Sequence, residues 1–105
     1  KFELAAENLV MATSLDEKDY FKFFNLAAAY NQLKQWENAT SAAQSCVDLN
    51  QKFGGGWLEF GLAEMGRRNK TRAKKYFDEA RKDRDWREMA ERKIDEINNP
   101  GKYEK

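Results

Sequence analysis

Residues 57–80, WLEFGLAEMGRRNKTRAKKYFDEA, decide the fold of this chain, because residues 23–46, FFNLAAAYNQLKQWENATSAAQSC, show the same pattern 34 positions earlier. The aligned positions keep their size class: Phe23 with Trp57, Ala27 with Gly61, Ala39 with Ala73, and Cys46 with Ala80. Self-similarity at a fixed period of this length predicts an array of repeated supersecondary units.

Each unit has the hydrophobic spacing of two helices. Phe23, Leu26, Ala27 and Tyr30 follow the i, i+3, i+4, i+7 pattern of one helical face. A second apolar stripe begins at Trp36 after a short break. We therefore expect helices near residues 2–15, 19–33, 36–50, 55–67, 70–83 and 85–98.

The motif W-x-x-F-G-x-x-E from Trp57, followed by A-x-x-x-F-x-x-A from Ala73, resembles a tetratricopeptide repeat (TPR). The resemblance covers residues 2–84 and implies an all-α, right-handed superhelical solenoid of helix-turn-helix repeats, in a single domain over residues 1–105. In this scheme residues 2–15 are the second helix of a truncated repeat, 19–50 and 54–84 are repeats, 85–98 are a capping helix and 99–105 are a tail. Five residues depart from the family pattern: Glu64 replaces an aromatic residue, Lys34 and Arg68 replace turn glycines, and Gln51 and Asp85 replace the proline at the end of a repeat.

The resemblance also implies a function, since the first helix of each TPR pair lines a concave groove. We expect a protein–protein interaction scaffold that binds a partner peptide or helix there. The groove residues implied by the resemblance are Phe21, Phe24, Asn25, Ala28, Asn31, Leu58, Glu59, Leu62 and Met65. An alternative interpretation is that Phe21 and Phe24 only pack against the helix expected at residues 2–15.

Two further surfaces are alternatives to the groove. Residues 67–84 carry nine basic and three acidic side chains, although the net charge of all 105 residues is only +1. The basic patch consists of Arg67, Arg68, Lys70, Arg72, Lys74 and Lys75, and it suits weak binding of RNA or of an acidic partner, although a solvated helix face is the simpler interpretation. The other alternative is self-association into a homo-oligomer through the apolar residues of the segment 2–15.

The glycine run Gly54-Gly55-Gly56 has two interpretations. It is a hinge, or a place where a ligand backbone approaches closely. Alternatively, it is a longer turn between repeats that delays the regular helix to Trp57. We favour the longer turn, because each glycine costs about 1 kcal/mol relative to alanine inside a helix.

The composition argues against catalysis and against bound cofactors or metals. The chain has no histidine, so the common Ser-His-Asp and Cys-His arrangements are excluded. A single cysteine without histidine does not form an ordinary zinc site, and the glycine run lacks the Gly-Lys-Ser/Thr of a phosphate-binding loop. No apolar run reaches the roughly 20 residues of a membrane-spanning helix.

Overall fold

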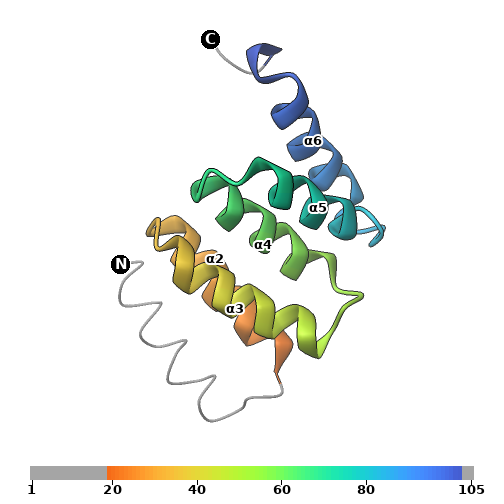
Figure 1. Cartoon of the computed structure of the whole chain (residues 1–105). Helices are drawn as coiled ribbons and strands as arrows, with labels where there is room; N and C mark the ends of the chain where they lie inside the picture. Colours follow the sequence, from red (N-terminus) through yellow and green to blue (C-terminus); the bar gives the residue numbers. More distant parts are fainter. Residues whose placement is uncertain (1–18, 103–105) are drawn as a thin grey trace.

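The structure is a computed structural model, and it describes residues 19–102. These residues form five α-helices and one short 3₁₀ turn, with no strand among them (Figure 1). The elements are α2 (Tyr20–Gln32), α3 (Trp36–Leu49), α4 (Gly54–Gly66), α5 (Lys70–Ala80), α6 (Arg87–Asn98) and η1 (Pro100–Lys102). The predicted all-α class is confirmed, and the helix expected at residues 2–15 lies outside the described residues.

The helix boundaries repeat with the period of the sequence. Helix α4 begins and ends 34 residues after α2, and α5 begins 34 residues after α3. The two intra-repeat turns also match, because Lys34 and Arg68 both have a positive φ, of 60° and 64°. After each of these residues the main chain closes the same turn, with Gln35 N donating to Tyr30 O (2.9 Å) and Asn69 N to Glu64 O (2.8 Å).

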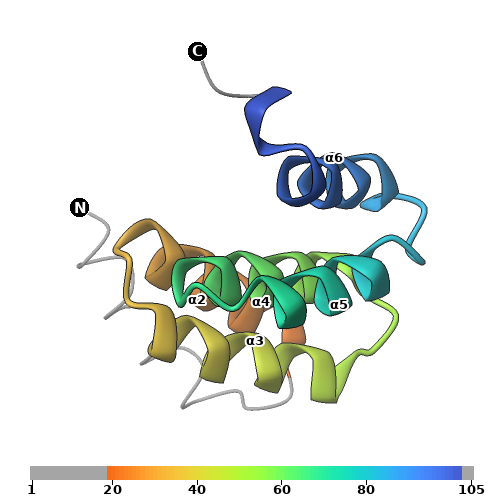
Figure 2. The same ribbon diagram turned by 45° about the horizontal axis from the view of Figure 1, so that its top comes forward.

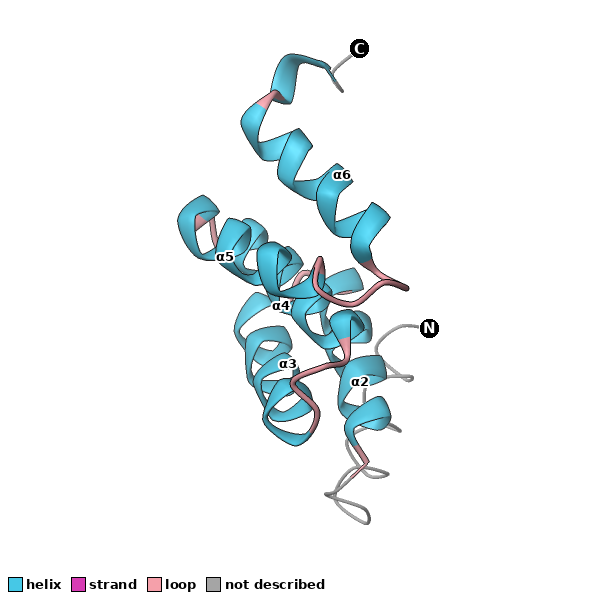
Figure 3. Cartoon of the chain, turned by 90° about the vertical axis from the view of Figure 1, so that its right-hand side faces the viewer, coloured by secondary structure: helices cyan, strands magenta, loops and turns pink. Residues whose placement is uncertain are grey.

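Neighbouring helices pack against one another along the chain. Helix α4 contacts α2, α3 and α5, while α6 packs mainly on α5. Figures 2 and 3 show that α3 and α5 lie on one side of the molecule and that α2 and α6 lie on the other, with α4 between them. Each side of the molecule is therefore formed by helices that come from different parts of the chain.

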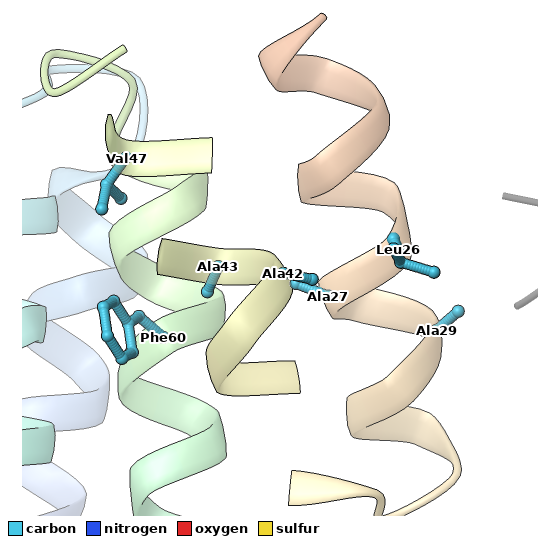
Figure 4. Packing of buried hydrophobic residues seen from close by; sticks show 7 residues of the cluster. All are labelled: Leu26, Ala27, Ala29, Ala42, Ala43, Val47 and Phe60. Atoms are coloured by element: carbon cyan, nitrogen blue, oxygen red, sulfur yellow. The ribbon is translucent and has the colours of Figure 1, made fainter. Parts of the chain in front are cut away.

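Small residues allow the helices to approach closely. One core cluster joins α2, α3 and α4 through Leu26, Ala27, Ala29, Ala42, Ala43, Val47 and Phe60. Figure 4 shows Ala27 and Ala42 meeting between α2 and α3, and Phe60 lying beside Ala43. A second cluster joins α4, α5 and α6 through Leu58, Ala73, Phe77, Ala80 and Ala90. Trp57 packs against both clusters and therefore connects them.

The expected delay of the helix to Trp57 is wrong, because α4 begins at Gly54 and all three glycines are buried. A Cβ atom on Gly54 would lie 2.7 Å from Asp83 Cβ, and one on Gly56 would lie 2.7 Å from Cys46 Sγ. Both distances are shorter than the contacts that real Cβ atoms make with other heavy atoms, so a side chain at either position would force its neighbours to move. The glycines therefore serve the close approach of other segments of this chain to the first turn of α4.

The start of α4 also explains why α5 ends at Ala80 rather than at residue 83. Asp83 leaves the helix, and its Oδ2 accepts a hydrogen bond of 2.7 Å from Gly54 N. This carboxylate satisfies one of the free N–H groups at the helix N-terminus, where a negative charge is also favourable. The α5–α6 connection is thereby attached to α4.

We expect Gly56→Ala to destabilise the fold, although alanine is the better helix former. The added Cβ would overlap the Sγ atom of Cys46, and overpacking of this kind costs about 1–3 kcal/mol. Chemical denaturation measures the change in the free energy of unfolding. Gly101→Ala is the matched control, because no atom lies within 4 Å of a Cβ at Gly101. A Gly56→Ala variant as stable as Gly101→Ala would contradict the packing argument.

We expect Lys34→Gly and Arg68→Gly to stabilise the fold. The left-handed backbone conformation costs a residue other than glycine about 1–2 kcal/mol, and a glycine there removes this cost. Glycine also loses more conformational entropy on folding, which reduces the gain in stability by about 0.5–1 kcal/mol. Each variant should therefore gain about 0.5–1 kcal/mol in thermal or chemical denaturation. Lys75→Gly, within α5, should instead lose about 1 kcal/mol. A loss of stability in Lys34→Gly and Arg68→Gly would contradict this expectation and would show that the two side chains stabilise the turns.

Candidate functional site

Five aromatic rings gather where three separate segments meet, beside the second core cluster, against which Trp86 packs. This aromatic cluster consists of Tyr20, Phe21, Phe24, Phe53 and Trp86. The ring centroids of Phe24 lie 5.1 Å from those of Phe53 and 5.6 Å from those of Trp86, and Phe53 and Trp86 are 5.8 Å apart. Phe21 is 51% exposed, so one edge of the cluster is open to solvent.

Local structure holds each ring of the aromatic cluster in place. The side chain of Asp19 caps α2 by accepting from Phe21 N (3.0 Å), which fixes the helical turn that carries Phe21 and Phe24. Phe53 directly precedes α4, and Trp86 ends the α5–α6 connection that Asp83 attaches to α4. A Cβ on Gly55 would lie 2.6 Å from Phe53 Cζ and 2.9 Å from Trp86 Cζ2, so these two rings pack against a helix surface without a side chain.

A polar pair joins α2 to α4 on the same predicted groove. Asn31 Nδ2 donates to the main-chain oxygen of Glu59 at 3.0 Å and to its Oε1 at 2.8 Å. Burial raises the pKa of the Glu59 carboxyl, and the hydrogen bond from Asn31 opposes this shift. Asn31 Oδ1 is buried and accepts no hydrogen bond from residues 19–102. The pair therefore contains an acceptor whose burial costs free energy as long as it has no donor.

The other predicted groove residues divide into two sets. Asn25 and Ala28 are partly buried on α2. Leu62 and Met65 on α4 pack against the second core cluster, to which Ile94 of α6 also belongs as a partly buried neighbour. Leu58 is only 2% exposed within that cluster, so the expectation of a groove-lining role is corrected for this residue. The physical reason is that α6 supplies the apolar partner that the exposed face of α4 would otherwise lack.

The predicted basic patch is not a uniform surface. Arg67 and Arg72 form ion pairs with Glu64, whose side chain is buried. The remaining members comprise the exposed Arg68, Lys70 and Lys75 and the partly buried Lys74. The apolar residues proposed for self-association belong to the segment 2–15, outside the described residues.

The sequence patterns did not indicate Phe53, Trp86 or Glu64 as residues of a candidate site. Phe53 and Trp86 directly precede α4 and α6. The direction of their side chains depends on the conformation of the preceding loop, which the hydrophobic periodicity of the sequence does not predict. The sequence did mark Glu64 as unusual, because a carboxylate occupies a position at which the repeat family has an aromatic ring. Only the positions of Arg67 and Arg72 reveal how that carboxylate is accommodated.

The described residues offer little for metal or thiol chemistry. Between residues 19 and 102, no three histidine, cysteine or acidic side chains lie close enough together to hold a metal ion. Cys46 is buried, and desolvation raises the pKa of its thiol to about 12, so the reactive thiolate scarcely forms at neutral pH. None of the helices in this part of the chain combines the length and hydropathy of a bilayer-spanning segment.

Comparison with protein-family models and with curated proteins finds no match for this chain. Functional assignment therefore depends on the geometry of the aromatic cluster and of the Asn31–Glu59 pair. Open aromatic rings are common anchors in protein–protein interfaces.

We expect Glu59→Gln to raise stability at neutral pH. Because the pKa of Glu59 is raised in the folded state, wild-type stability falls as the pH rises from the ordinary value of 4.5 through that raised pKa. Glutamine keeps an acceptor for Asn31 and carries no charge. The free energy of unfolding of Glu59→Gln should therefore exceed that of the wild type at pH 7, and the difference should shrink below pH 4.5.

Urea denaturation over this pH range measures the effect of Glu59→Gln. The exposed Glu88 of α6 provides the matched control, since Glu88→Gln should change stability by less than about 0.5 kcal/mol. A Glu59→Gln variant that is less stable than the wild type at pH 7 would show that the charged form of Glu59 is favoured in the fold.

Proposed function

We propose that this chain is a TPR-like helical-repeat scaffold, rather than an enzyme, and that its α2–α4 face binds a segment of another protein. The repeat assignment is supported by the 34-residue offset of the helix boundaries and by the matching left-handed residues Lys34 and Arg68. The binding proposal depends chiefly on one observation, the aromatic cluster with Phe21 half exposed at its edge.

The aromatic cluster suits an apolar side chain of a partner. Its rings come from three segments that are attached to one another, so little conformational freedom remains to be lost on binding. Each further square ångström of apolar surface removed from water contributes about 25 cal/mol. Aromatic residues at the centre of such a patch commonly contribute most of the binding free energy.

The Asn31–Glu59 pair suits the main chain of the same partner. Asn31 donates to Glu59, and the partly exposed carboxylate of Glu59 retains acceptor positions that a peptide N–H of the partner can fill. Binding in this mode gives affinity through the main chain and leaves selectivity to the aromatic cluster. An extended or helical segment with one large apolar anchor fits both features.

Selection from a displayed random-peptide library, followed by calorimetry on the selected peptide, tests the proposal. Phe21→Ser should weaken binding about tenfold or more, because it removes an exposed aromatic contact. Leu49→Ser is the matched control, since Leu49 is 44% exposed on α3 and is not a member of the aromatic cluster. Circular dichroism checks that both variants are folded. Equal losses in the two variants, or a larger loss for Leu49→Ser, would refute binding at the aromatic cluster.

A further inference from the structure

Helices α3 and α5 both pack on α4 and leave a cleft of about 420 Å³ between them. The floor of this α3–α5 cleft is formed by Phe60 and Glu64 of α4, and its walls include Ser41, Arg67, Arg72 and Tyr76. No member of the aromatic cluster lines this cleft. Figure 3 shows α3 and α5 on the side of α4 that faces away from α2.

Glu64 is the feature of the cleft that the fold by itself does not explain. Its side chain is 2% exposed, and burying a carboxylate costs several kcal/mol unless it is well paired. Arg67 Nη1 lies 3.4 Å from Oε1, and Arg72 Nη1 lies 3.7 Å from Oε2. Both distances exceed the roughly 2.7–2.9 Å of a strong charge-assisted hydrogen bond. The ion pairs therefore leave much of the hydrogen-bonding capacity of the arginines unused.

The two guanidinium groups remain accessible from the cleft. The side chain of Arg67 is 41% exposed and that of Arg72 is 61% exposed. Arg67 follows the last turn of α4 and Arg72 belongs to the first turn of α5, so the buried carboxylate attracts both side chains toward one place. Each guanidinium has a planar set of donors suited to a second oxyanion.

The first repeat provides an internal comparison. A smaller cleft of about 210 Å³ between α2 and α3 is lined by Leu26, Tyr30, Asn38 and Ala42, among others. After a shift of 34 positions these residues correspond to Phe60, Glu64, Arg72 and Tyr76. Among the described residues, the same location in the repeat is therefore lined by neutral side chains in one copy and by a buried carboxylate and an arginine in the other. The repeat architecture does not require these charges.

We propose that the α3–α5 cleft is a second binding site, which holds a carboxylate side chain of an acidic peptide segment between Arg67 and Arg72. The charged groups that line the cleft are Glu64, Arg67 and Arg72, so their sum of +1 matches a single carboxylate. Tyr76 stacks on Phe60 with ring centroids 3.9 Å apart and provides an apolar wall for the methylene groups of the ligand. This site is independent of the function proposed for the α2–α4 face.

A peptide carboxylate fits the cleft better than a nucleic acid. RNA binding uses several cations along a backbone together with open rings on which bases stack. Here only two arginines converge on the cleft, while Arg68, Lys70 and Lys75 are outside its lining. Phe60 is buried beneath Tyr76, so it offers no free face.

Titration of the ¹⁵N-labelled chain with a blocked peptide, acetyl-Ala-Glu-Ala-amide, tests the site through the arginine Nε–Hε resonances. We expect saturable shifts of the Arg67 and Arg72 signals, and no saturable shift with the Ala-Gln-Ala peptide. Arg72→Asn, which introduces the residue type of Asn38 in the first repeat, should weaken binding at least tenfold. Lys75→Gln removes the same charge from α5 outside the cleft and should change the affinity less than twofold.

Three outcomes would overturn the proposal. Equal weakening by Arg72→Asn and Lys75→Gln would show general electrostatic attraction only. A phosphoserine peptide that binds more than tenfold tighter than the glutamate peptide would identify a phosphate site instead. Displacement of the peptide by an octauridine RNA, with an affinity that falls steeply as salt rises, would identify a nucleic-acid surface. If Arg72→Asn loses its helical circular dichroism, Arg67→Gln is measured in its place with the same expected weakening.

Discussion

The first turn of α4 lies closer to other parts of the chain than any side chain would permit, and the rest of the structure depends on this contact. Asp83 and Trp86 approach Gly54, Phe53 and Trp86 approach Gly55, and Cys46 approaches Gly56. The hydrogen bond from Gly54 N to Asp83 Oδ2 attaches the α5–α6 connection at the same point. The last turn of α3, Phe53 and the α5–α6 connection therefore converge on one helical turn.

This convergence positions the surface proposed to bind a partner. The rings of Phe53 and Trp86 pack over a bare helix surface, and Phe24 of α2 completes the contact at 5.1 Å and 5.6 Å. A larger residue at Gly55 would displace both rings. The aromatic cluster is consequently a product of backbone packing as much as of aromatic composition, which gives it the rigidity that favours binding.

Helix α4 also carries two carboxylates in different environments. Glu59 faces α2, where its one side-chain hydrogen bond comes from the neutral Asn31 and burial raises its pKa. Glu64 faces the α3–α5 cleft, where two arginines compensate its charge. One helix thus presents a carboxylate paired with an amide on one side and an ionic cluster on another. This difference gives the two proposed sites different ligand chemistry, an apolar anchor with a main-chain donor in one and a carboxylate in the other.

The sequence by itself determined the all-α class, the helix order and the 34-residue period, because hydrophobic spacing and helix-breaking turns are local properties. The resemblance to a repeat family implied that Phe21, Phe24, Asn31 and Glu59 line one groove, and the structure joins Phe21 to Phe24 and Asn31 to Glu59. Only the tertiary structure decided that Leu58 is buried beside Ala90, that the glycines lie inside α4, and that Arg67 and Arg72 converge on Glu64. These features depend on contacts between segments far apart in the chain, and periodicity contains no information about which distant side chain fills a given space.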